Sequence, residues 1–232
     1  MKLFILCGEN NISGGYIYYI DKENTVYLTL DDKNMYSLEI INEIKESSNI
    51  SFSFLVSNGK YLINNKHKLE LIDNFNGFKL YFEIDSKKLI NINNSFIWMK
   101  NAIFNKQSNR ENVEFCYSVF KNENMNDILI NNKNSNSKYN TLYYGYYKSN
   151  EMDFSFLLNF EKNNKVVYRF RNLVLLEGSF KRLRNNVICV TDKSLKHLFY
   201  FLVFKNAIKP IVFPHNEIIL KRTLPLPTRA KQ

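Results

Sequence analysis

Histidine and cysteine are the residue types whose spacing could build a metal site or a nucleophilic site in this chain. Three cysteines, Cys7, Cys116 and Cys189, lie far apart and form no CxxC pair, so we expect free thiols, with one intermolecular disulfide as an alternative, and no structural zinc. No histidine has a second histidine two to four residues away, or a cysteine nearby. The three histidines are His67, His197 and His215.

The motifs of common catalytic sites are missing from the sequence. It contains no GxSxG nucleophile elbow, no P-loop and no GxGxxG turn. Tyr144 and Lys148 have the YxxxK spacing of the acid–base pair of short-chain dehydrogenases, but that chemistry needs a helix under the pair, whereas this stretch predicts a strand. We therefore expect a protein that is not an enzyme and has no cofactor. An active site assembled from distant residues stays open as an alternative without a supporting motif.

Basic residues are the strongest indication of a binding function. Lysine and arginine outnumber aspartate and glutamate by 32 to 22, which gives a net charge of +10. Basic residues beside aromatic ones, as around Tyr168 and Phe170, can hold single-stranded nucleic acid. A solubilising lysine surface explains the same charge. The candidate nucleic-acid residues are Arg169, Arg171, Lys181, Arg182 and Arg184.

A cluster of tyrosines is the most unusual feature of the composition. Tyrosine offers a large contact area with a polar tip, which suits protein–protein contacts. In a strand, alternate residues of the cluster would face opposite sides, so at least one face would be a contact surface or a solvent face, and sheet packing is the other interpretation. The candidate residues for assembly and for sensitivity to alkaline pH are Tyr143, Tyr144, Tyr146 and Tyr147, together with Lys209 and Pro210 of the closing stretch.

The elements that must position these residues are mostly predicted strands. Hydrophobic residues make up 45% of the 232 residues, which excludes a disordered chain. Asn-Gly pairs predict hairpins over 51–63 and 68–84, and another hairpin is expected over 15–30. Helices are expected over 31–46, 94–104 and 122–130, and a polar loop over 131–140. Further strands are expected over 2–7, 113–120, 141–147, 153–160, 165–176 and 187–190.

The sequence shows no internal repeat and no domain linker, so we expect a single β-rich domain over 1–232. No apolar run approaches the 18 residues of a transmembrane helix, and the apolar start is too short for a signal peptide. We expect no membrane association and a protein that is intracellular when made.

The closing stretch, residues 191–232, predicts a helix followed by a final strand. Leu195, Leu198, Phe199, Leu202 and Val203 recur three and four residues apart, as on one face of a helix. A proline, at 210, would end that helix, and the strand would cover 217–224.

This stretch resembles the C-terminal region of the baculovirus polyhedrin and granulin family, the matrix proteins of insect-virus occlusion bodies. The resemblance rests on the aromatic helix, on Lys209-Pro210-Ile211-Val212-Phe213, and on the strand beginning at Glu217. It covers about 35 residues, and the turn between the motif and the strand departs from the family in length and charge. It implies a jelly-roll-like β-sandwich that forms homo-oligomers such as trimers and packs into a crystalline lattice around virions. It also implies synthesis in the nucleus of an infected host cell.

Such lattices dissolve at alkaline pH, and the composition offers a mechanism. Tyrosine and lysine titrate near pH 10 to 10.4, so a chain with 15 tyrosines and a lysine-rich surface would become strongly negative above that range. Its contacts would then repel. The sequence therefore predicts a self-assembling structural protein, with a basic nucleic-acid-binding protein as the alternative.

Overall fold

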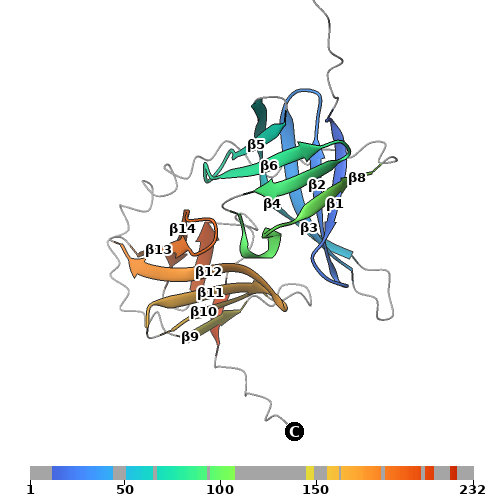
Figure 1. Cartoon of the computed structure of the whole chain (residues 1–232). Coiled ribbons are helices and arrows are strands. Elements are labelled where there is room, and N and C mark those ends of the chain that lie inside the picture. The colour runs from blue at the N-terminus through green and yellow to red at the C-terminus, as the bar shows by residue number, and fades with distance from the viewer. Residues whose placement is uncertain are drawn as a thin grey trace, which may run out of the picture.

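The described part of the chain folds into two closed antiparallel barrels of eight strands each (Figure 1). This computed structural model describes residues 12–43, 51–64, 67–92, 95–107, 145–148, 156–161, 163–183, 186–204, 207–211 and 220–223. In each barrel, strands adjacent in sequence pair with one another, and the last strand pairs with the first. This meander confirms the mostly β expectation. The jelly-roll order implied by the resemblance is not found.

The first barrel closes when β1 pairs with β8, through Tyr16 opposite Lys106. A single 3-10 turn, η1 (Ile97–Met99), lies between β7 and β8 on the side that faces the second barrel (Figure 1). The strands are β1 (Gly14–Tyr19), β2 (Asn24–Leu30), β3 (Met35–Glu43), β4 (Ser51–Asn64), β5 (Lys68–Asp73), β6 (Lys79–Asp85), β7 (Lys88–Ile92) and β8 (Ile103–Lys106).

The second barrel closes when β16 pairs with β9, through Lys221 opposite Lys148. Pro210 lies on β15 beyond the last residue that pairs with β16. Proline has no N–H to donate, and at this position no hydrogen bond between strands is lost. The strands are β9 (Gly145–Lys148), β10 (Phe156–Phe160), β11 (Lys165–Phe170), β12 (Leu173–Arg182), β13 (Val187–Asp192), β14 (Leu198–Val203), β15 (Ala207–Ile211) and β16 (Leu220–Thr223).

The two barrels repeat one design, which the sequence analysis missed. The turns after β5 and β13 each begin with an aspartate, Asp73 or Asp192. In each turn the carboxylate accepts the backbone N–H groups of the residues two and three positions later. The residue four positions later, Gly77 or Lys196, has a positive φ and donates its N–H to the aspartate carbonyl. The same turn therefore stands at the same place in both barrels.

A bulge and a close-packed glycine are repeated as well. Val56 on β4 and Leu175 on β12 are the extra residues of two equivalent bulges, and both are fully buried. Three residues later a glycine, Gly59 or Gly178, lies so near the next strand that a Cβ would come within 2.0 Å or 1.9 Å of a carbonyl oxygen. The aspartate turn, the bulge and the close-packed glycine together make up a backbone frame that both barrels share, although most of their side chains differ.

The predicted helix over 31–46 is wrong, because that segment contains strand β3. Tyr36, Leu38 and Ile40 alternate along it and are almost completely buried, between β2 and β4. The helical spacing of Leu38 and Ile41 was incidental to this period of two.

The predicted helix in the closing stretch is also wrong. Residues 198–203 and 207–211 form strands β14 and β15 of the second barrel. The predicted helix–strand arm therefore does not exist. Phe199, Phe201 and Val203 alternate into the core, and Leu202 is buried on the other face of the strand. Burial on both faces gives a continuous apolar run, which periodicity cannot distinguish from a helix.

Of the remaining predicted elements, some are confirmed, some are wrong or altered, and some fall outside the described residues. Hairpins over 15–30 and 68–84 are confirmed, whereas 51–64 is one continuous strand and not a hairpin. The helix over 94–104 shrinks to η1 followed by β8, and 165–176 is divided by a turn where Arg171 has φ 49°. Strands over 153–160 and 187–190 are found as β10 and β13, and β9 and β16 cover parts of 141–147 and 217–224. Expectations for 2–7, 113–120, 122–130 and 131–140 fall outside the described residues.

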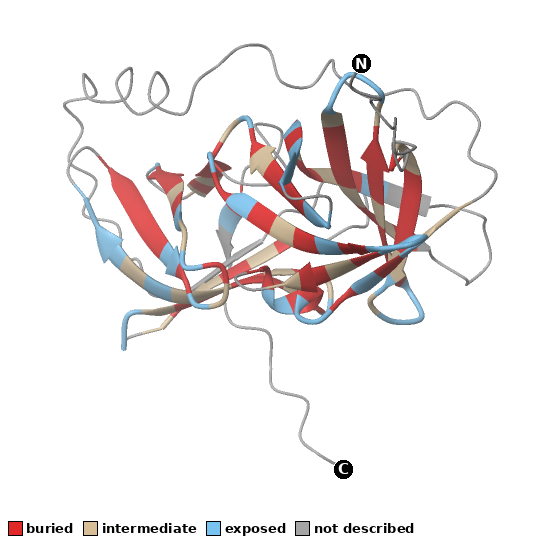
Figure 2. Cartoon of the chain, turned by 45° about the horizontal axis from the view of Figure 1, so that its top comes forward, coloured by how far each residue is buried: buried red, intermediate tan, exposed pale blue. Residues whose placement is uncertain are grey.

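Both barrel interiors are filled by side chains. Buried residues alternate with exposed ones along the strands (Figure 2). One cluster of buried hydrophobic residues extends through both barrels. The two barrels are therefore joined by a shared apolar core.

Candidate functional site

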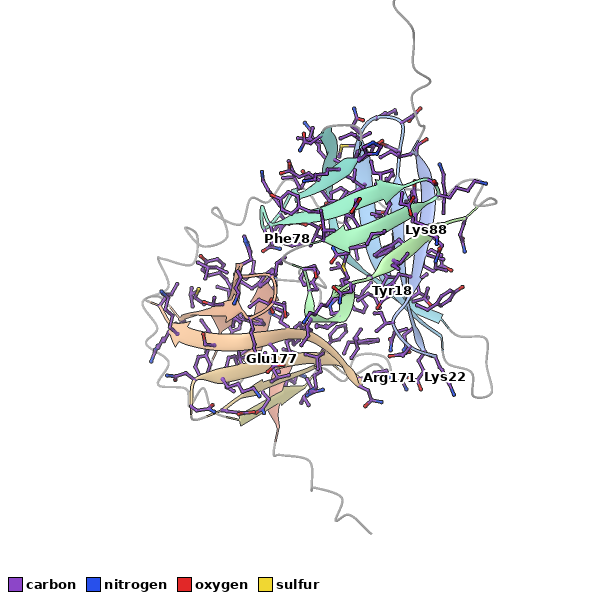
Figure 3. The ribbon with its side chains drawn as sticks, in the orientation of Figure 1. Tyr18, Lys22, Phe78, Lys88, Arg171 and Glu177 are labelled. Atoms are coloured by element: carbon purple, nitrogen blue, oxygen red, sulfur yellow. The ribbon has the colours of Figure 1, made fainter. Side chains whose placement is uncertain are left out.

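The most distinctive site is the seam, the interface where the two barrels meet, which is built from aromatic rings. Phe54 of β4 contacts Phe156 and Phe170 with ring centroids 5.5 and 5.1 Å apart, both edge-on. Phe78, on the side of the first barrel that faces the second (Figure 3), contacts Phe199 at 6.0 Å. Such edge-to-face pairs stabilise beyond their buried area by roughly 0.5–1.5 kcal/mol each.

Two polar contacts cross the seam. The Arg171 guanidinium donates to Asn42 Oδ1 at 2.9 Å. His197 Nε2 lies 3.0 Å from the carbonyl oxygen of Asn76, so that nitrogen carries the proton. Burial lowers the pKa of His197 from its usual value, which keeps the ring neutral near pH 7.

The seam also holds polar groups without a partner. Both side-chain polar atoms of Asn76 are buried with no hydrogen-bond partner, as is Nε1 of Trp98. Trp98 is stacked on Phe96 at 5.1 Å, with the two rings 4° from parallel. Each unpaired group opposes burial by about 1–3 kcal/mol, so the seam is held by its apolar contacts.

Equivalent residues of the two barrels meet across the seam. Phe78 and His197 each follow their turn aspartate by five residues, and each carbonyl accepts that aspartate's N–H. Their rings lie 5.9 Å apart. Contact between equivalent positions is typical of a two-fold, self-complementary interface. At this point the barrels meet as two subunits meet at the centre of a homodimer interface, whereas Phe54 contacts Phe156 and Phe170, which are not its equivalents.

Among the residues that the structure describes, a buried polar chain is found in the first barrel and not in the second. The Tyr36 hydroxyl donates to Ser57 Oγ at 2.7 Å, and Ser57 donates to Asp73 Oδ1 at 2.6 Å. Burial raises the pKa of Asp73 to about 6, although its hydrogen bonds act in the opposite direction. In the second barrel Val166 and Leu176 occupy the places of Tyr36 and Ser57, so Asp192 lacks this chain.

Several tyrosines lie inside the barrels, where ionisation is disfavoured. Burial raises the pKa of Tyr16 to about 12 and raises those of Tyr36 and Tyr168 well above the ordinary value of a tyrosine. The Tyr168 hydroxyl is fully buried and has no hydrogen-bond partner. These tyrosines couple the stability of the barrels to alkaline pH.

The tyrosine cluster expected to form contacts lies largely outside the described residues. Tyr143 and Tyr144 are among the undescribed residues, and Tyr146 and Tyr147 belong to β9, where they pair with Asn159 and Leu158. Lys209 and Pro210, the other assembly candidates, lie on β15 opposite Leu202 and Phe201.

The basic residues expected to form one patch are separated by the fold. Arg169 lies near the seam end of β11, and Arg171 lies in the turn that follows this strand and donates a hydrogen bond to Asn42. Lys181 and Arg182 lie at the far end of β12, roughly 25–30 Å away at ~3.3 Å per residue. Arg184 is outside the described residues.

Histidine and cysteine build no metal site in the part of the chain that the structure describes, where no group of three or more His, Cys, Asp or Glu side chains could hold a metal ion. Cys189 is a buried free thiol, His67 is exposed, and Cys7, Cys116 and His215 lie outside the described residues. No helix among the described residues is long and apolar enough to cross a membrane.

Comparison with known proteins finds no matching family model, no similar curated protein and no similar solved structure. Sequence reasoning missed Asp73 and His197, which occupy the seam side of their barrels. The spacing that could have revealed them is an aspartate four residues before Gly77 and four before Lys196, each preceded by an apolar strand.

Proposed function

We propose that the chain is a structural protein that assembles with copies of itself through the outer ends of its barrels, the ends opposite the seam. The product would be the matrix of an insect-virus occlusion body, with the oligomers, lattice and enclosed virions that the resemblance implies. The helix in that resemblance is absent, so the proposal rests on the packing of the barrels rather than on the motif at Lys209-Pro210.

One observation carries the proposal: both outer ends expose large apolar side chains. At the end of β4 in the first barrel, Leu62 and Ile63 are 49% and 47% exposed. At the outer end of the second barrel, Leu183 and Phe204 are 36% and 40% exposed. Adjacent exposed apolar residues of this size favour a protein–protein contact over a purely solvated end.

The seam supports a second copy of this chain as the partner. The inner ends of the barrels meet at the equivalent residues Phe78 and His197, which is the kind of contact found at the centre of a self-complementary interface. The two outer ends are different surfaces, so contacts that join an outer end of one copy to the other outer end of the next would propagate into an extended assembly rather than close into a dimer.

The test is the mass of the assembly with and without the outer apolar residues. We expect the double variant Leu62→Lys/Ile63→Lys to sediment as single chains under conditions where the wild type forms large particles. Ile103→Lys is the matched control, because Ile103 is 45% exposed on β8, away from that outer end, and should assemble normally. If the double variant assembles like the wild type, the outer ends are not the contact.

Nucleic-acid binding stays as a second proposal in a narrower form. Lys181 and Arg182 are both exposed on β12 and belong to the same outer end as Leu183. Binding of a single-stranded oligonucleotide should weaken steeply with salt and should be reduced in Lys181→Gln/Arg182→Gln. Assembly contacts should instead respond chiefly to pH, which separates the two proposals.

A further inference from the structure

A groove on the second barrel gathers lysine side chains in a way that the first barrel does not. This lysine groove has a volume of about 530 Å³, and its lining consists of Lys165, Glu177, Gly178, Ser179, Thr191, Asp192, Lys193 and Lys196. Lys165, Ser179 and Thr191 lie directly opposite one another on β11, β12 and β13. Cross-strand partners share one face of a sheet, so an ammonium group and two hydroxyls form a row across the barrel. Lys193 and Lys196 come from the adjoining aspartate turn.

Two carboxylates, those of Glu177 and Asp192, also line the groove, and both have partners within the barrel. Glu177, on β12 (Figure 3), lies 3.5 Å from the ammonium group of Lys165. The Asp192 carboxylate accepts the backbone N–H groups of its own turn. Lys193 and Lys196 are exposed and have no carboxylate partner among the described residues, so their charges can face a ligand.

The first barrel provides an internal comparison, because its equivalent positions are identified by the shared turn, bulge and glycine. Where the second barrel has Lys165, Lys193 and Lys196, the first has Met35, Asn74 and Gly77. Thr191 likewise replaces Ile72. The frame needs none of these lysines, since the first barrel folds the same way without them.

Lys196 occupies a position in the aspartate turn of the second barrel where the backbone is strained for a residue with a side chain. Its φ is 59°, in the left-handed region, at the place where the first barrel has Gly77 with φ 72°. Side chains other than glycine and asparagine are disfavoured there, and such strain persists where the surroundings or function require it.

We propose that the lysine groove binds a chain of linked phosphate groups. Lysine ammonium groups and hydroxyls are suitable partners for phosphate oxygens. The groove is much larger than one phosphate, and its lining contains no aromatic ring on which a base could stack. A polyphosphate chain, free or carried by a nucleotide, fits this lining. The proposal does not depend on self-assembly, because the groove lies away from both outer ends.

Calorimetric titration of the full chain with tripolyphosphate at low salt tests the proposal. We expect Lys193→Gln/Lys196→Gln to bind about tenfold more weakly, since each exposed ionic contact contributes a few-fold. Lys22→Gln/Lys100→Gln removes the same charge from exposed positions on the first barrel and should change binding by less than about twofold. Equal weakening in both double variants would overturn the site.

Two further arms address ligand and folding. ATP should bind as tightly as tripolyphosphate, and sulfate at equal ionic strength should bind much more weakly than tripolyphosphate. The assignment would be overturned if sulfate bound as tightly as tripolyphosphate, or if ATP bound and tripolyphosphate did not. Lys196→Gly restores the residue that the turn favours, so it should keep or raise the urea midpoint while weakening tripolyphosphate binding. If Lys196→Gly leaves binding unchanged, the turn is not part of the site.

Discussion

Tyr168 offers the sharpest test of how the barrels respond to alkaline pH. Its hydroxyl is fully buried in the second barrel and has no hydrogen-bond partner, and burial raises its pKa far above the ordinary value of 10. Replacing it with phenylalanine removes the unpaired group and keeps the ring, including the contact to Phe201 at 5.9 Å. We expect Tyr168→Phe to be more stable than the wild type at pH 7, by about 1 kcal/mol.

The same substitution should flatten the alkaline loss of stability. A group whose folded pKa lies above its unfolded pKa contributes stability that is fully present below the unfolded value and is lost as pH rises toward the folded one. Above pH 10, each such tyrosine lowers the free energy of unfolding by about 1.4 kcal/mol per pH unit. Tyr16, Tyr36 and Tyr168 together would give roughly 4 kcal/mol per unit, and Tyr168→Phe should reduce this by one third.

Urea unfolding followed by Trp98 fluorescence between about pH 7 and pH 11.5 measures both effects. Tyr19→Phe is the matched control, because Tyr19 is 64% exposed, and it should leave the alkaline slope unchanged. If Tyr168→Phe is less stable than the wild type at pH 7, or has the wild-type slope above pH 10, the reasoning from burial is refuted.

Three other substitutions test the repeated frame and the seam. Because burial raises the pKa of Asp73 to about 6, the contribution of Asp73 to stability is highest below about pH 4 and falls by roughly 3 kcal/mol as pH rises from about 4 to about 6; urea unfolding of Asp73→Asn should show this dependence removed. Gly178→Ala would place a Cβ 1.9 Å from the Thr191 carbonyl oxygen and should destabilise by roughly 2–4 kcal/mol in the same assay, whereas Ser179→Ala at the neighbouring exposed position should change little. Because burial lowers the pKa of His197, its contribution to the stability of the seam is present above pH 6.5 and is lost in acid. Trp98 fluorescence should therefore change below pH 6 in the wild type but not in His197→Phe. An identical acid response in both proteins would contradict this role.

Local sequence signals predicted the parts of the fold that depend on local chemistry. The Asn76-Gly77 pair forms a tight turn because Gly77 adopts φ 72°, and that hairpin is confirmed. The pair Asn58-Gly59 has the same letters but lies within a long strand, because Gly59 is required where β5 passes too close for a Cβ. The same Asn-Gly pair therefore marks a tight turn at Gly77 and a close approach of two strands at Gly59.

Helix and strand could not be distinguished where both faces of a strand are buried. Phe199 and Phe201 point into the core while Leu202 is covered on the other face, so no alternation was visible. The repeat was hidden for a related reason: it is carried by backbone geometry at a few positions, such as Asp73 and Asp192, while the side chains between them differ. The tandem design, and with it the seam and the groove, therefore required the structure.

The measurement that bears most directly on self-assembly through the outer ends is the mass of the full chain by multi-angle light scattering, with pH raised from about 7 to about 11 at fixed salt. We predict particles of many copies near pH 7 that separate into single chains as tyrosine and lysine titrate above about pH 10. Single chains near pH 7 at every concentration tested, or particles that persist unchanged at pH 11, would contradict the account.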